Sequence, residues 1–238
     1  SDAAPMSPKT TTKTKTTRWW WIRHAPVDNP ERRLYGQSDI DAIVSDTDDF
    51  KQLAKHLPSD GVWVASHLKR THQTAQAIIP HFKARGHNAP ELLTHPELAE
   101  QNFGDWQGMT YNELKAHLGD GFDDFWKAPA RAQPPAGESF AAVINRVQCI
   151  TDQLNRTHEG SDIIAFAHGG SIRAALAVAL GLDPDAALNF QIDTLSLTRI
   201  DHILPGDNPP SGSVQPWRIG VVNHSPTPGV PKIMHPRG

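Results

Sequence analysis

Short uninterrupted apolar runs alternate along the chain with longer stretches in which apolar residues recur every three or four positions. Short runs rich in Trp, Ile and Val and bounded by polar or breaker residues are typical of strands buried on both faces. The pattern predicts strands at residues 19–22, 61–65 and 162–167, another around Leu195 and Leu197, and a last one at 217–222.

The helical spacing predicts helices whose ends carry recognisable start and stop signals. They span residues 48–57, 67–82, 111–118, 140–154 and 170–180. Ser66 is expected to cap the second helix, and Pro80 to kink or end it. Thr110 opens a capping box, Ser139 caps the fourth helix, and Gly181 closes the last.

Strands that alternate with helices of this length imply right-handed βαβ units. The predicted fold class is therefore α/β, a three-layer αβα sandwich with a mostly parallel central sheet. Residues 1–17 lack apolar periodicity and are expected to form a disordered tail, with one domain over residues 18–238. Residues 107–138 are aromatic, acidic and Pro-rich, and are expected to form a lid-like excursion from this domain.

Composition narrows the classes of function. The 238 residues carry a net charge of -3, and without a basic excess neither nucleic acid nor an anionic membrane is expected as a partner. No signal peptide and no membrane-spanning apolar run are found, so a cytoplasmic protein is expected. The single cysteine, Cys149, cannot form an internal disulfide and is expected to be a small core residue.

Charged side chains follow three of the predicted strands. Arg23 and His24 end the first strand, Arg70 follows the second, and His168 follows the third. The carboxyl ends of parallel strands meet at one edge of a sheet, which is where ligands bind in open α/β folds. Arginine is the preferred partner of a phosphate dianion, and a neutral imidazole such as His24 can attack phosphorus. His168 begins a helix, where its ring could stabilise the phosphoryl oxygens, and Gly169 lets a ligand approach the backbone.

The leaving oxygen of a phosphomonoester needs a proton, and Glu100 is the candidate acid, with Asp105 and Glu97 as weaker candidates. Taken singly, each of these residues has an ordinary structural interpretation, as a strand terminus, a helix-end charge or a surface carboxylate. Their common chemistry at three strand ends favours a shared phosphate site. The 13 histidines show no metal-ligand spacing, so neither a metal nor a cofactor is expected.

Four segments resemble motifs of one known family, in the family's order. Residues 23–25 resemble the RHG signature of the histidine phosphatase superfamily, also called phosphoglycerate-mutase-like, and residues 66–75 its SxLxRTxQTA segment. Residues 98–108 are similar to its LxExxFGxWxG segment and residues 167–173 to its AHGxxIR segment. The resemblance covers roughly residues 20–223. Residues 134–147 and 191–223 are similar to the branch of α-ribazole phosphatases and small broad-specificity phosphatases.

The resemblance implies a phosphoglycerate-mutase-like fold with a phosphorylated histidine as intermediate. It makes His24 the nucleophile and Glu100 the acid and base. It also assigns Arg23, Asn29, Arg70 and His168 to binding the phosphate of the substrate, and Gly169, which lets the ligand approach the backbone, is expected to contact it as well. Asn29 matches the family's asparagine only if one residue is deleted from the intervening loop. Ala25 stands where the family has glycine, which would place an extra methyl group beside the phosphate.

The predicted function is metal-independent hydrolysis of a small phosphomonoester, with α-ribazole 5'-phosphate and sugar phosphates among the substrates. Two alternatives stay open: a mutase that returns the phosphoryl group to another hydroxyl, and a regulatory protein that binds phosphate without turnover. The alcohol half of the substrate is expected to meet the excursion, including Tyr111, Phe122, Phe125 and Trp126. The sequence leaves the oligomeric state open.

Overall fold

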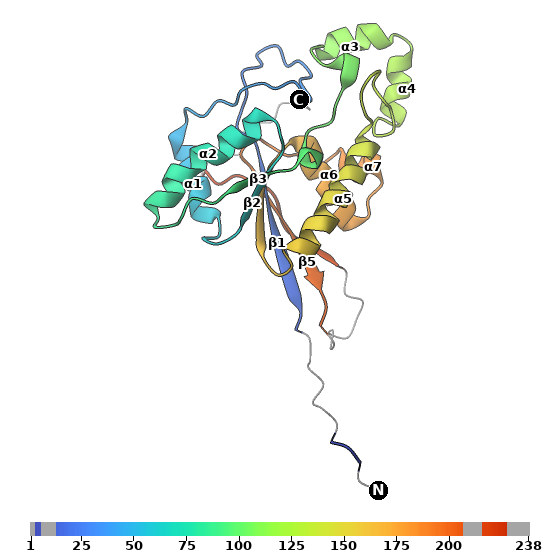
Figure 1. Ribbon diagram of the computed structural model, residues 1–238. Helices are drawn as coiled ribbons and strands as arrows, with labels where there is room; N and C mark the ends of the chain where they lie inside the picture. Colours follow the sequence, from blue (N-terminus) through green and yellow to red (C-terminus); the bar gives the residue numbers. More distant parts are fainter. Residues whose placement is uncertain (1–2, 6–12, 207–215, 228–238) are drawn as a thin grey trace.

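Strand β1 (Lys15–Arg23) lies inside a six-stranded sheet of order β3-β2-β4-β1-β5-β6. The computed structural model describes residues 3–5, 13–206 and 216–227 (Figure 1). The other strands are β2 (Val62–Ala65), β3 (Leu92–Thr94), β4 (Asp162–Ala167), β5 (Leu197–Leu204) and β6 (Trp217–His224). The pairings from β3 to β1 are parallel, and β5 and β6 add two antiparallel pairings at one side. The expected mostly parallel sheet is confirmed.

Helices cover both faces of this sheet, which gives the three layers that the alternation predicts (Figure 1). One face packs against α1 (Thr47–His56) and α2 (Lys69–Ala84), and the other against α5 (Phe140–Thr157), α6 (Gly169–Leu180) and α7 (Pro184–Ala187). Side chains of successive residues in β4 point to opposite faces of the sheet. Ile164 and Phe166 pack in the hydrophobic core under α1 and α2, and Ile163 and Ala165 pack in the core under α5, α6 and α7.

The beginning of α2 differs from the prediction. The helix starts at Lys69 with Leu68 at its N-cap, and no side chain caps it. Ser66, expected as the cap, instead accepts a hydrogen bond from the Leu68 N–H and contacts the ring of His168, 2.8 Å away. The predicted cap at Ser66 is therefore wrong, because α2 begins three residues later and the Ser66 hydroxyl contacts His168, the residue that follows β4.

Helix α2 also continues through Pro80 to Ala84. An interior proline removes one hydrogen bond and crowds the preceding turn, which usually ends a helix. Here Phe82 is 1% exposed and packs against the ring of Trp63, with 5.5 Å between centroids. Burial of this side chain stabilises the last turn, so an end at Pro80 is wrong.

The remaining helix signals act as expected. Thr110 and Glu113 form the capping box of α3 (Tyr111–Leu118), Ser139 caps α5, and Gly181 ends α6 in the left-handed conformation. The expected excursion contains α3 and the short α4 (Gly121–Lys127), which lie together beyond the sheet at one end of the molecule (Figure 1). Two 3-10 turns, Pro96–Leu98 and Gly104–Trp106, precede it.

Two predictions about single segments need correction. The disordered tail was expected to reach residue 17, but Lys15 to Thr17 pair with β5 as the start of β1. Residues 1–2 and 6–12 of that tail lie outside the described residues. Cys149 is exposed, because the buried face of α5 is formed by residues such as Val147 and Ile150 on either side of it. In the described part of the chain, no helix is both long and apolar enough to cross a membrane.

Candidate active site

The two candidate histidines follow neighbouring parallel strands in register. Arg23 pairs with Ala167 in the ladder between β1 and β4, and the His24 N–H donates to the Ala167 carbonyl at 3.0 Å. The Ser66 N–H donates to the carbonyl of Phe166, so the end of β2 lies at the same edge. The ring centroids of His24 and His168 are consequently 5.3 Å apart. The sheet ladder itself brings the two imidazoles together.

The ring of His24 presents one nitrogen with a free lone pair. Its Nδ1 lies 2.6 Å from the Ala25 carbonyl oxygen, which can only accept, so Nδ1 carries the proton and Nε2 does not. The side chain is 1% exposed. Burial, followed by the charges of Arg23 and Arg70, holds the pKa of His24 well below its usual value of 6.5. The imidazole is therefore neutral at pH 7 and can act as a nucleophile.

Arg70 brings a fully buried positive charge to the same edge. Its guanidinium donates to the carbonyls of Gly36 and Ser38 and lies 4.8 Å from the ring centre of Tyr35. Burial lowers the pKa of Arg70, but an arginine still keeps its charge at neutral pH. The Nε–H groups of Arg70 and Arg23 are both buried and have no hydrogen-bond partner among the described residues. Two charged donors are thus available to an anion.

His168 is the N-cap residue of α6 and is also fully buried. Its Nε2 contacts the Ser66 hydroxyl, while Nδ1 has no partner within the described residues. Burial is the main cause that holds the pKa of His168 well below 6.5, and the charges of Arg70 and Arg23 act in the same direction. Nδ1 is therefore the ring nitrogen that a phosphoryl oxygen could contact.

Glu100 reaches the N-terminus of α6 from an irregular loop. One carboxylate oxygen accepts from the Gly170 N–H at 3.2 Å and the other from the Gln101 N–H at 2.8 Å. A Cβ atom on Gly170 would lie 1.9 Å from Glu100 Oε1, so only glycine allows this approach. The Gly170 amide at this helix end therefore binds Glu100. The carboxylate also interacts electrostatically with Arg70.

The other expected site residues lie in different surroundings. Gly169 lies close to the Arg23 side chain: a Cβ atom added at Gly169 would be 3.6 Å from the guanidinium carbon of Arg23. The side-chain amide of Asn29 bonds at both ends to the backbone of Arg33. The methyl group of Ala25 is fully buried and belongs to the apolar cluster of α1 and α2. The methyl group that distinguishes Ala25 from the family's glycine therefore packs in the hydrophobic core.

The weaker acid candidates, Asp105 and Glu97, are both exposed. His72 bonds to the Ser66 carbonyl and His67 is exposed. Within residues 3–5, 13–206 and 216–227, no group of three or more His, Cys, Asp or Glu residues could hold a metal ion.

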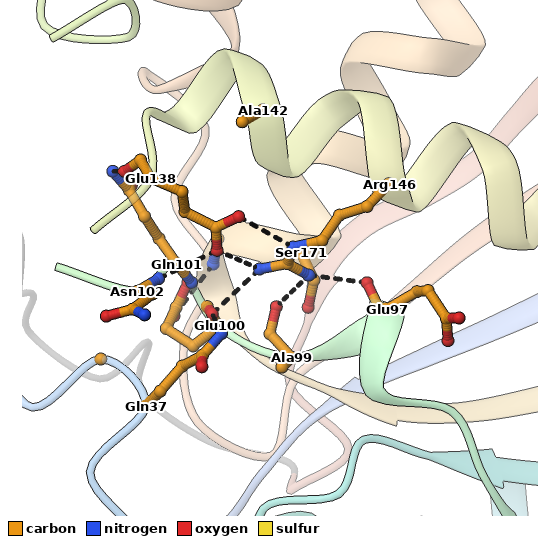
Figure 2. A network of polar contacts seen from close by, with 12 residues as sticks. Gln37, Glu97, Ala99, Glu100, Gln101, Asn102, Glu138, Ala142, Arg146 and Ser171 are labelled. Atoms are coloured by element: carbon orange, nitrogen blue, oxygen red, sulfur yellow. Dashed lines mark hydrogen bonds and ion pairs between the residues drawn. The ribbon is translucent and has the colours of Figure 1, made fainter. Parts of the chain in front are cut away.

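Sequence reasoning did not assign several residues that surround the site. Tyr35 and the carbonyls of Gly36 and Ser38 contact Arg70. Arg146 and Glu138 support the backbone on both sides of Glu100 (Figure 2). Glu138 lies just before α5 and Arg146 lies within it. Nothing in this local sequence indicates that both contact the loop that carries Glu100, because residues far apart in the chain make that contact.

Comparisons with known proteins identify the family of this chain. Residues 19–205 match the histidine phosphatase superfamily (branch 1). Glucosyl-3-phosphoglycerate phosphatase of Mycolicibacterium vanbaalenii is 33% identical over 86% of this chain and 93% of its own. Phosphoserine phosphatase 1 of Hydrogenobacter thermophilus is 29% identical over 75% of this chain and 83% of its own.

The fold has close relatives among solved structures. The α-ribazole phosphatase of Shigella flexneri superposes with a TM-score of 0.70 and 22% identity, over 90% of this chain and 99% of its own. That likeness concerns the fold, whereas the family match covers the strand ends and the loop that build the site. The chain belongs to the histidine phosphatase superfamily, branch 1.

Proposed function

We propose that this protein hydrolyses small phosphomonoesters through a phosphohistidine on His24. The observation that carries the proposal is the unprotonated Nε2 of His24 at one strand edge. This edge also holds the buried Nε–H groups of Arg23 and Arg70, which have no partner in the described part of the chain, and a second neutral imidazole, that of His168. These groups supply a nucleophile and positive charge for the phosphoryl oxygens without rearrangement of the core. As proposed, the reaction uses no metal, so its rate should be unchanged by a chelator such as EDTA.

In the first step, His24 Nε2 forms a bond to phosphorus while the ester P–O bond breaks. Arg23, Arg70 and His168 donate hydrogen bonds to the phosphoryl oxygens as negative charge shifts among them. Glu100 gives its proton to the leaving oxygen, which departs as a neutral alcohol. The products of this step are phospho-His24, the alcohol and an ionised Glu100.

In the second step, the Glu100 carboxylate removes a proton from water. The oxygen of that water forms a bond to phosphorus as the N–P bond of phospho-His24 breaks. Inorganic phosphate leaves, His24 is again neutral, and Glu100 has regained the proton that it gave away. One water is consumed for each ester hydrolysed.

The proposed substrates are small phosphorylated metabolites, with α-ribazole 5'-phosphate or a sugar phosphate first among them. Support comes from relatives named as phosphatases of phosphoserine and of glucosyl-3-phosphoglycerate, and from the fold shared with an α-ribazole phosphatase. Measurement of phosphate release from a broad panel of phosphomonoesters would identify the preferred alcohol.

The direct test is to trap the intermediate. Rapid acid-free quenching with labelled substrate should give base-stable, acid-labile phosphate on His24, and His24→Ala should give none while keeping its fold. Phosphate release that proceeds without any acceptor sugar acid separates a phosphatase from a mutase. Tight binding of phosphate or vanadate without hydrolysis across the panel would instead favour a regulatory protein. Equal turnover by the wild type and His24→Ala would contradict the assignment.

A further inference from the structure

The loop that carries Glu100 contains no helix or strand from residue 99 to residue 103. Its position therefore depends on contacts from elsewhere in the chain. Those contacts come largely from two side chains, Arg146 in the second turn of α5 and Glu138 just before that helix (Figure 2). Neither residue belongs to the phosphate pocket.

Arg146 uses all five of its N–H donors in this one place. Nη1 donates to the carbonyls of Glu97 and Ala99, at 2.6 and 2.8 Å, and Nη2 donates to the carbonyl of Glu100 at 3.0 Å. Nε and the second Nη2 proton go to the two carboxylate oxygens of Glu138, at 3.2 and 2.7 Å. A guanidinium offers five donors in a rigid plane, so a lysine with three mobile donors could not reproduce this set.

Glu138 holds the loop on the other side of Glu100. Its Oε1 accepts from the Asn102 N–H at 3.0 Å, its own N–H donates to the Asn102 carbonyl, and its carbonyl accepts from Gln101 Nε2. Arg146 thus fixes the carbonyls up to Glu100, and Glu138 fixes the residues directly after it. Both side chains are about one-fifth exposed, at 20% and 22%, so the pair is largely removed from water.

The contacts of Arg146 stop at the backbone of Glu100, whose carboxylate is turned to the Gly170 amide instead. With the loop carbonyls fixed on one side and the α6 amide on the other, the carboxylate has a defined position beside the phosphate pocket. A displacement of a catalytic group by about 1 Å can lower a rate about 10²-fold. Small movements of this backbone would therefore matter for proton transfer.

We infer that Glu138 and Arg146 are positioning residues that set where Glu100 delivers its proton. This inference rests on the proposed function, in which Glu100 protonates the leaving oxygen. It predicts a defect mainly in the proton-transfer step, because the proposed phosphate ligands Arg23, Arg70 and His168 receive no hydrogen bond from the pair in the described structure. The charge of Arg146 does act on His168, and Arg146→Lys keeps that charge.

The test compares two leaving groups in single-turnover phosphorylation of His24. An alkyl phosphate needs a proton on its departing oxygen, whereas 4-nitrophenolate leaves without one. Arg146→Met should lower the rate with the fastest alkyl phosphate of the panel about 10- to 100-fold and the rate with 4-nitrophenyl phosphate less than about threefold. Arg146→Lys and Glu138→Gln should give smaller losses with the same preference.

A double-mutant cycle shows whether the effect passes through Glu100. In a Glu100→Gln background, Arg146→Met should change the alkyl phosphate rate less than about twofold, because the acid is already absent. Arg218→Met is the matched control, since Arg218 also forms an ion pair, with Asp201 at 3.0 Å, but on β6 away from the site. It should leave both rates unchanged.

Three results would overturn the positioning role while leaving the phosphatase assignment standing. They are equal losses with both leaving groups, no loss with either, and additive losses in the cycle. If Arg146→Met does not fold, Arg146→Lys and Glu138→Gln decide the same question. If the wild-type protein forms no phospho-His24, the proposed phosphatase mechanism itself is contradicted. This outcome differs from the three above, so failure of the mechanism can be distinguished from failure of the positioning role.

Discussion

The proposed phosphate pocket, formed by His24, Arg70 and His168 with Arg23, and the excursion at residues 107–138 are held in place by different parts of the molecule. Three of the pocket residues, His24, Arg70 and His168, are at most 1% exposed. The two histidines directly follow β1 and β4, and Arg70 lies in the first turn of α2, which follows β2. In the excursion, Tyr111 is 55% exposed and Trp126 is 39% exposed. One region belongs to the core, and the other extends beyond it (Figure 1).

The packing of the excursion explains this difference. Its rings mainly contact one another, with centroid distances of 5.0 Å for Phe125 and Trp126 and 5.6 Å for Tyr111 and Phe122. A pocket inside the core is costly because charges lose water, but its groups are already oriented for the phosphoryl oxygens. An exposed cluster can change its sequence at little cost in stability. We therefore expect phosphate chemistry in the core and alcohol selection in the excursion.

Removal of Arg70 should produce the largest effect. Arg70→Met takes away a charged phosphate ligand, so kcat/KM should fall about 10³-fold or more, and phosphate affinity should fall with it. It also removes the donor of the buried Gly36 carbonyl and of the part-buried Ser38 carbonyl, which should lower the free energy of unfolding by about 1–3 kcal/mol. Calorimetric titration with phosphate and urea unfolding measure the two losses, and an unchanged phosphate affinity would refute the role of Arg70.

Glu100→Gln should separate the two halves of the reaction. Turnover of alkyl phosphates should fall about 10²- to 10³-fold, because the leaving oxygen receives no proton. Binding of inorganic phosphate should remain within about threefold of wild type, since the arginines and His168 are untouched. Both quantities can be measured on the same protein. Full activity of this variant would remove Glu100 from the mechanism.

The buried histidines should make stability depend on pH in a defined direction. Their pKa values are lowered in the folded protein, so below about pH 6.5 the unfolded chain binds protons that the folded one does not. The free energy of unfolding should be level above pH 6.5 and decrease as the pH falls from 6.5 toward 5. His168→Gln should show a smaller decrease over this range in urea unfolding. A wild type that becomes more stable on acidification would contradict the burial of neutral imidazoles.

The smallest effect is expected in the excursion. Trp126→Ala should change kcat for 4-nitrophenyl phosphate less than about threefold and the free energy of unfolding by less than about 1 kcal/mol, because this side chain is partly exposed. The ratios of kcat/KM among alkyl phosphates should shift instead. Steady-state kinetics across the panel provide the measurement. A loss as large as that of Glu100→Gln would place this residue in the chemistry and erase the contrast between the two regions.

Local patterns were sufficient for the strand ends. Apolar runs that stop at Arg23, Ala65 and Ala167 place the following polar residues at one edge, because parallel strands have a common direction. The pairing of Arg23 with Ala167 then requires His24 and His168 to be neighbours. The cap at Thr110 and the left-handed Gly181 were predictable for the same reason, since only the adjacent residues are involved.

Local patterns failed where a distant contact decides the outcome. Pro80 does not end α2, because Phe82, two residues later, packs on Trp63 of strand β2. Ser66 does not cap α2, because its hydroxyl contacts His168, a residue 102 positions away. In both cases a tertiary contact outweighs the local preference.

The sequence by itself determined the α/β layering and the residue types of the proposed phosphate pocket, because these depend on periodicity and on the ends of strands. Only the tertiary structure decided how Glu100 is held, through Arg146 on one side and the Gly170 amide on the other. The loop around Glu100 has no periodic pattern, so its position depends on partners that are 46 and 70 residues away along the chain.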